Sequence, residues 1–336
     1  MSTKSSFDRS LISMSRNGGY TLVELLASMV VFSGLIVLLL SAVSAISSVY
    51  MRSDNRSKSA ESGRAAIELM ARELAPAIVD TRMQFVIMPV ENLPAQDVVQ
   101  GAKSAPVILW MAPLGPLGEM RCVGYYLKRD QENRLFQLKR IYIKPDNDSY
   151  FPRMANAEKA LDTSLRTSPV NADWFIKNWD ETAFDEEGEG EHIATTMENG
   201  IVALVVSAID SMGNPIPHAS RSKNHPQSNL WFNSAGYFHM AQGQRFDDDS
   251  SFVYLGAGDY VMKANRLPAA IDIALVMLGR DELSRLKSVP EMELQFAGEG
   301  AVDIEETLKV YLSALSDTGA SQSVVVKTRV NLTNGG

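Results

Sequence analysis

The amino-acid sequence predicts an α+β protein in which one long N-terminal helix packs on a mainly antiparallel β domain with long loop insertions. Two observations support this prediction. Residues Leu25 to Val49 form an uncharged run of apolar or small side chains. Beyond residue 79, short apolar or alternating segments are separated by turn residues, which is the pattern of antiparallel strands. Apolar residues make up 45% of the chain, which is enough for a core.

The apolar run divides the chain into three expected parts. At about 1.5 Å per residue, residues 25–49 are long enough to cross the roughly 30 Å hydrocarbon layer of a bilayer. Basic residues precede this run, so residues 1–19 are expected to be a cytoplasmic leader and the residues after Tyr50 to lie outside. The N-terminal helix is expected over 20–79, amphipathic after its membrane span. The globular domain is expected over 80–336, with insertions near 145–191 and 218–249.

Charge argues against a nucleic-acid partner. The formal net charge is −8, and the leader carries Lys4, Arg9 and Arg16 against Asp8, so the rest of the chain carries −10. Phosphate binding needs clustered Lys and Arg, and the body of the chain has no such cluster. The single cysteine, Cys122, excludes a disulfide within the chain and is expected to be a buried apolar side chain in a strand.

Three kinds of N-terminal segment fit the apolar run: a cleaved signal peptide, a signal anchor, or a leader that is cut before the run. Val43 and Ala45 would suit an ordinary signal peptidase. That alternative leaves Glu24 unexplained, because this carboxylate stands at the edge of the run, five residues after a glycine pair. The junction reads Arg16-Asn17-Gly18-Gly19-Tyr20-Thr21-Leu22-Val23-Glu24-Leu25-Leu26.

This junction resembles the type IV prepilin family, in which cleavage follows a glycine, an aromatic residue becomes the new terminus, and Thr-Leu-Val-Glu-Leu follows. The resemblance implies that prepilin peptidase cuts between Gly19 and Tyr20 and N-methylates Tyr20. It also implies that Leu22, Val23, Glu24, Leu25 and Leu26 serve assembly in the inner membrane, with the large domain in the periplasm. Glu24 would pair with the α-amino group of a neighbouring subunit, which can fix register even where it adds little stability.

The body contains a helical stripe and several strand patterns. Ile67, Met70, Leu74 and Ile78 recur at helical spacing, and Gly63 and Pro76 are weak points of that helix. Strands are expected over 107–111, 121–128, 135–144, 201–209, 271–277 and 324–330, with 121–128 and 135–144 as a hairpin and a turn at 213–215. Short helices are expected over 281–287 and 304–316, the second with Asp303 as N-cap and Gly319 just past its end.

The order of these segments resembles the larger minor pseudopilins, namely the J-type subunit of type II secretion, and the W-type minor pilins. Large prepilin-like proteins of verrucomicrobia are similar as well. The specific part of the resemblance covers about the first fifty residues. The resemblance to minor pseudopilins and minor pilins implies a subunit that caps or primes a short filament.

Competing chemistry has little support in the sequence. It contains no Gly-x-Ser-x-Gly, no His-Glu-x-x-His and no phosphate-binding loop, and Gly256-Ala257-Gly258 is interpreted as a turn. The four histidines, His192, His218, His225 and His239, lack ligand spacing, so no metal or other cofactor is expected. The acidic stretches 180–191 and 247–249 are interpreted as solvated loops, with calcium binding the less favoured alternative. Trp174, Phe175, Trp179 and Phe184 are expected to anchor the first insertion or to form a binding patch.

Three function classes follow. The first is a minor pseudopilin or pilin subunit that works by assembly, with prepilin peptidase, other pilin or pseudopilin subunits and the inner membrane as partners. The second is an adhesive or substrate-binding module on the same anchor, with the two insertions as its contact surface. The third, an enzyme, is the least favoured because no catalytic constellation is visible.

Overall fold

The computed structural model of the chain places most of the expected elements. It describes residues 21–79, 85–90, 93, 105–129, 136–147, 150–151, 179, 181–184, 192–216, 232–233, 253–254, 261–262, 268–286, 289–297, 301–320 and 323–333. The leader, Gly19, Tyr20 and most of the two expected insertions lie outside these residues.

Helix α1 spans Leu22–Leu74. It ends five residues before the expected end at 79 and just before the weak point Pro76, because proline cannot donate a backbone N–H to the helix. The chain forms two compact units, residues 1–54 and 55–336, and α1 contributes to both.

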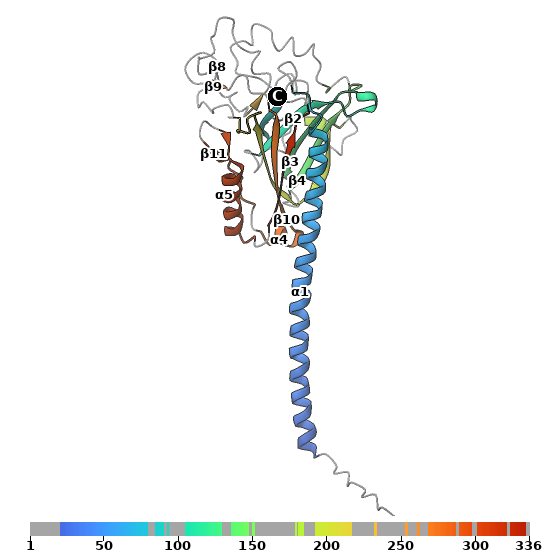
Figure 1. The fold of residues 1–336 in the computed structure, drawn as a ribbon. Helices are drawn as coiled ribbons and strands as arrows, with labels where there is room; N and C mark the ends of the chain where they lie inside the picture. Colours follow the sequence, from blue (N-terminus) through green and yellow to red (C-terminus); the bar gives the residue numbers. More distant parts are fainter. Residues whose placement is uncertain are drawn as a thin grey trace, which may run out of the picture. The chain divides into compact units, whose positions relative to one another are not determined.

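The larger sheet of the second unit is antiparallel throughout its described pairs (Figure 1). Its strand order is β5 (Ala194–Asn199), β4 (Phe136–Ile143), β3 (Arg121–Arg129), β2 (Pro106–Ala112), β1 (Val86–Pro89) and β7 (Phe232–Asn233). The predicted hairpin is confirmed as β3–β4, with Tyr125 opposite Arg140. Cys122 is buried in β3, as expected, and burial raises the pKa of its thiol. The sequence analysis did not predict β1, β5 or β7.

A second sheet has the order β13 (Ser323–Asn331), β10 (Ala270–Leu278) and β6 (Ile201–Ile209), again antiparallel. The strand predicted over 271–277 is confirmed as β10. In the structure every residue of β10 except Asp272 is buried. The reason is that β10 is the central strand, and α1 and α5 contact opposite faces of this sheet.

Register shows which face each helix contacts. Met277 of β10 and Val326 of β13 both lie close to Gly63 of α1. Side chains alternate along a strand, so Lys327, which follows Val326, lies on the other face. There it pairs with Glu305 in the first turn of α5 (Ile304–Asp317).

The remaining elements are short. They are η3 (Pro116–Gly118), η5 (Glu181–Phe184), β8 (Val253–Tyr254), β9 (Val261–Met262), α4 (Arg280–Arg285), β11 (Phe296–Ala297) and β12 (Ala301–Val302). The structure confirms both predicted C-terminal helices. Asp303 caps α5, accepting a hydrogen bond from the Glu306 N–H at 3.0 Å, and Gly319 follows the helix with φ +99°.

Gly63 is a contact point of α1 rather than a weak point. It is buried, and a Cβ atom at this position would lie 2.2 Å from Met277 Sδ and 3.2 Å from Val326 Cγ2. Glycine lets the helix lie this close to Met277 and Val326, whereas a larger residue would require the Met277 side chain to move. Ile67, Met70 and Leu74 are buried along the predicted stripe.

Gly200 joins the two sheets. It separates β5 from β6, its N–H donates to the Phe136 carbonyl of the larger sheet, and its own carbonyl accepts from the Leu278 N–H of the smaller one. Its φ is +87°, and a Cβ atom would lie 2.9 Å from the Leu278 carbonyl oxygen. The chain therefore passes between the sheets at a position that favours glycine on two grounds.

The end of β13 is fastened to the end of α1. The Thr333 N–H and hydroxyl both donate to the Ala75 carbonyl, at 2.9 and 2.7 Å. Beside them, the Leu332 N–H donates to the Ala269 carbonyl at 2.8 Å.

These contacts predict that alanine destabilises the protein more at Gly200 than at Gly213, although the two glycines have nearly equal φ. Gly200→Ala and Gly213→Ala each place a side chain at a φ of +87° or +85°, but nothing lies within 4 Å of the added atom at Gly213. Gly213→Ala should cost about 1 kcal/mol of unfolding free energy. Gly200→Ala should cost about 1–3 kcal/mol more, because the new methyl group overlaps a backbone carbonyl. Urea unfolding of the full chain in detergent, followed by tryptophan fluorescence, measures both, and equal costs would contradict this account of Gly200.

Candidate functional site

The start of α1 is a capping box formed by Thr21 and Glu24. The Glu24 N–H donates to Thr21 Oγ1 at 3.3 Å. In return, Glu24 Oε2 accepts from the Thr21 N–H at 3.1 Å and from the Thr21 hydroxyl at 3.3 Å. This reciprocal pattern satisfies backbone donors that the first turn of a helix leaves without partners. Glu24 therefore has a local role that the sequence analysis did not consider.

The first half of α1 presents only exposed side chains. Leu22, Val23, Leu25 and Leu26, the residues expected to serve assembly, are all exposed beside Glu24. The same holds for every residue from 21 to 53. This part of the helix is long and apolar enough to span a membrane. A surface this large and apolar needs a cover of lipid or protein.

The second half of α1 is held to the larger sheet by a buried carboxylate, Glu73. Its side chain accepts hydrogen bonds from the Tyr125 hydroxyl at 2.5 Å, from Arg140 Nε at 3.0 Å, and from Arg140 Nη2. The Glu73 backbone carbonyl accepts from Trp110 Nε1 at 3.1 Å. One residue of α1 thus binds side chains from β2, β3 and β4.

Charge and burial shift the pKa values of two groups that bind Glu73, the Tyr125 hydroxyl and the Arg140 guanidinium. Burial raises the pKa of the Tyr125 hydroxyl, and the negative charge of Glu73 raises it further. Burial opposes the charge of Arg140, but the hydrogen bonds and charge of Glu73 outweigh it, so the pKa of Arg140 is raised. The Arg140 guanidinium also lies 4.1 Å from the ring centroid of Tyr142. Tyr125 therefore stays a neutral donor and Arg140 a cation, which makes this cluster a fastening point.

The aromatic residues of the first insertion anchor it to the body, so far as the structure describes them. Trp179 and Phe184 are buried, with ring centroids 6.0 Å apart in an edge-on contact. Phe184 makes a similar contact with Tyr126 of β3 at 6.0 Å. Tyr126 follows Tyr125 and so points to the face of the sheet away from Glu73. Trp174 and Phe175 lie outside the described residues.

Metal-binding residues do not cluster in the described parts of the chain. Within those residues no group of three His, Cys, Asp or Glu side chains could hold an ion. His192 is half-buried. His218, His225, His239, Gly256, Gly258, the acidic stretch 247–249 and most of 180–191 lie outside the described residues.

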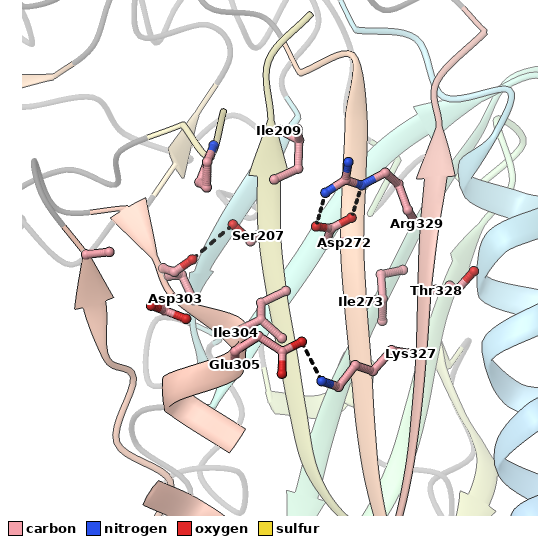
Figure 2. Close-up of a pocket in the computed structure, with 13 residues that line it drawn as sticks. Ser207, Ile209, Asp272, Ile273, Asp303, Ile304, Glu305, Lys327, Thr328 and Arg329 are labelled. Atoms are coloured by element: carbon pink, nitrogen blue, oxygen red, sulfur yellow. Dashed lines mark hydrogen bonds and ion pairs between the residues drawn. The ribbon is translucent and has the colours of Figure 1, made fainter. Parts of the chain in front are cut away.

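A groove of about 580 Å³ lies on the Asp272 face of the smaller sheet, beside the first turn of α5 (Figure 2). Arg329 of β13 binds Asp272 of β10 through two hydrogen bonds of 2.6 and 2.7 Å. Lys327 Nζ lies 2.6 Å from Glu305 Oε1. The hydrogen bonds that Arg329 donates to the Asp272 carboxylate, together with its negative charge, raise the pKa of the Arg329 guanidinium. The apolar part of the lining comes from Ile209, Pro215, Ile273, Ala297, Val302 and Ile304.

The charged side chains that line the groove have partners within the described residues. Its two basic side chains are each paired with an acidic one, and Asp303 is occupied as the cap of α5. The two ion pairs join β13 to β10 and to the first turn of α5.

The sequence analysis missed Glu73 and its partners. Arg140 offered the one available signal, because it shares an inward-facing set with Phe136 and Leu138 on β4. A charged residue in such a set calls for a buried partner. The helical stripe could not identify that partner, since Glu73 adjoins the stripe without belonging to it.

Comparison of the chain with family models, curated proteins and solved structures finds no match. Function is therefore inferred from the chain's own residues and geometry.

The Glu73 cluster predicts a large effect of a small substitution. Glu73→Gln keeps the shape of the side chain but leaves Arg140 as a partly buried charge without a carboxylate, which should cost about 3 kcal/mol of unfolding free energy. Glu306→Gln is the matched control, because Glu306 is exposed and pairs only with exposed Lys309. Its cost should stay below about 0.5 kcal/mol. Urea unfolding of the full chain in detergent measures both, and equal effects would contradict the role of Glu73.

Proposed function

We propose that this chain is a structural subunit of the minor pseudopilin or minor pilin kind. Prepilin peptidase cleaves it between Gly19 and Tyr20 and methylates the new amine. The apolar part of α1 holds the subunit in the inner membrane, with the domain after residue 54 in the periplasm. The subunit then enters or primes a type II secretion pseudopilus or a type IV pilus, and its role is assembly and not catalysis.

The observation that carries the proposal is the uncovered apolar half of α1 with a single carboxylate at its start. A plain membrane anchor gains only the helix cap from a glutamate at this position, whereas a carboxylate inside the membrane boundary costs a few kcal/mol. Membrane helices that pack side by side provide a use for it. Leu22, Val23, Leu25 and Leu26 are exposed on both sides of Glu24 and would form the contact.

Within its own chain Glu24 stabilises the helix through the capping box, and the free energy of this cap can be compared with the cost of burying the carboxylate. A cap of this type contributes about 1 kcal/mol, which is less than the cost of placing the carboxylate in an apolar environment. A charged amine is a stronger partner than the Thr21 N–H, because charge-assisted hydrogen bonds are roughly twice as strong as neutral ones. The α-amino group of a neighbouring subunit would therefore replace Thr21 as the main partner of Glu24 and align the two helices.

The processing step is tested by the mass of the mature protein. The chain purified from its native membranes should begin at Tyr20 and carry one additional methyl group on its amine. Intact-mass and N-terminal peptide mass spectrometry measure this directly. A chain that retains Met1, or one that begins near Ile46, would contradict the proposal.

The assembly step is tested by comparing two glutamates of the same helix. Glu24→Ala should reduce incorporation into the filament at least tenfold without preventing cleavage at Gly19, because the lost pair sets the register of helix packing and not recognition by the peptidase. Glu61→Ala is the control, since Glu61 is exposed on α1 beyond the apolar half. Incorporation is measured by recovery of each variant with sheared filaments or with cross-linked subunits. Equal incorporation of both variants would remove the assigned role of Glu24.

A further inference from the structure

Two arginines of α1 follow its apolar half directly. Arg52 and Arg56 lie three and seven residues beyond Val49, where the uncharged run ends. Both side chains are exposed, and neither guanidinium forms an ion pair or a hydrogen bond with any residue that the structure describes. Arg140 and Arg329, by contrast, each bind a carboxylate. Arg52 and Arg56 therefore carry charges that the described residues do not neutralise.

The spacing of the two arginines makes their charges unfavourable for the helix. Residues four positions apart lie on the same face of an α-helix, so like charges at this spacing repel each other. Asp54 stands between them in the sequence, but it lies about 200° around the helix from Arg52. Asp54 also interacts elsewhere. An anion bound to both guanidinium groups would remove the repulsion.

The position along the helix places both groups at the level of lipid headgroups when α1 spans a membrane. At about 1.5 Å per residue, Arg52 lies about 5 Å and Arg56 about 10 Å beyond the apolar run. The headgroup layer is about 5–8 Å thick on each side of the hydrocarbon. Side chains of a helix tilt towards its N-terminus, so Arg56 leans back towards this layer. The exposed Tyr50 fits the same boundary, because tyrosine is enriched where membrane meets water.

We propose that Arg52 and Arg56 together bind the phosphate group of an anionic phospholipid, on the side of the membrane that faces the folded domain. This inference rests on the proposed membrane anchor and names the lipid that the anchor contacts. A guanidinium group is planar and donates paired hydrogen bonds to phosphate oxygens. Two such groups on one helix face suit a single headgroup, whereas a nucleic acid needs a longer row of basic residues.

The proposed orientation gives the two arginines a cost that a lipid partner offsets. Lys and Arg are disfavoured within about 15–20 residues of the outward-facing end of a membrane span. Arg52 and Arg56 stand at that end. Lipid phosphates surround the helix at this depth as soon as it is inserted, whereas a protein partner reaches it only on assembly. The headgroup is therefore the occupant that matches both the charge and the position of the pair.

The first test compares arginines of the same helix. The full chain is placed in nanodiscs that contain equal amounts of phosphatidylglycerol and phosphatidylcholine, and native mass spectrometry counts the lipids that stay bound. The wild-type chain should retain phosphatidylglycerol in preference. Arg52→Gln and Arg56→Gln should each lower this preference about fivefold, and the double variant about 25-fold. Glutamine keeps the helix propensity of arginine, so the fold should be unaffected in circular dichroism.

Two further variants serve as controls in this test. Arg64 is also exposed on α1 and has no interaction with a described residue, but it lies about 22 Å beyond the apolar run, outside the headgroup layer. Arg64→Gln should therefore leave the lipid preference unchanged. Replacing both Arg52 and Arg56 with lysine should keep most of the preference, because the charge remains.

Three results of the first test would overturn the inference. They are equal retention of the two lipids by the wild-type chain, an unchanged preference in the double glutamine variant, and an equal loss in Arg64→Gln. A chain that does not enter nanodiscs at all would contradict the proposed anchor, and the inference would fall with it. A chain that enters them without a lipid preference would contradict the inference alone, so the two failures are distinguishable.

The second test locates the headgroup on the chain. Phosphatidylglycerol with a photoreactive diazirine on its headgroup is added to the nanodiscs, which are irradiated before peptide mass spectrometry. Cross-links should fall within residues 50–57 and disappear in the double glutamine variant. Excess inorganic phosphate should not reduce them, because the bilayer holds the lipid phosphate at this depth. Cross-links mainly to residues 64–72, or labelling that inorganic phosphate abolishes, would overturn the inference.

Discussion

The contact on which the second unit depends is the carboxylate of Glu73, bound between Tyr125 and Arg140. It fixes the last turn of α1 to strands β3 and β4, while the Glu73 carbonyl receives Trp110 from β2. A buried ion pair adds little net stability compared with apolar packing, but it permits only one alignment of its partners. The apolar stripe of α1 could slide along the sheet, whereas this set of hydrogen bonds cannot be formed in any other register. The position of α1 on its domain is therefore set by polar contacts.

The two carboxylates of α1 illustrate two uses of the same group. The Glu73 carboxylate accepts hydrogen bonds from Tyr125 and Arg140 of its own chain, one of which is a cation. Glu24 is exposed, and among the described residues its side chain is bound by Thr21, which supplies neutral donors. A carboxylate with a weak partner in an apolar setting is the kind of group that a second chain can satisfy better. The proposed assembly role and the observed fastening role thus follow from the number and charge of the donors around each residue.

Local sequence patterns predicted helices and strands, whereas contacts between residues distant in the sequence determined which of their faces are buried. The predicted α5 with its Asp303 cap and the hairpin β3–β4 are both present, since capping and turn chemistry act within a few residues. Strand β10 was predicted at 271–277, but its burial on both faces depends on pairing with β6 and β13, whose partner residues are 45 or more positions away in the sequence. Likewise the sequence marks Gly63 as flexible, while its role depends on Met277. Of the candidate site, the sequence predicts Glu24 and its apolar neighbours, but the cap from Thr21 was overlooked although it lies three residues away.

The bond between Thr333 and Ala75 has a consequence for synthesis. The Ala75 carbonyl, just after the end of α1, is bound by a residue that leaves the ribosome more than 250 positions later. Strand β13 also supplies an edge of the smaller sheet, so that sheet stays open until the strand has been translated. Contacts between such distant residues form slowly, because a long loop must close before they are made. The nascent chain would therefore be tethered at the bilayer while its domain is unfinished, and this period is when a chaperone or a neighbouring subunit would have access to its unpaired strands.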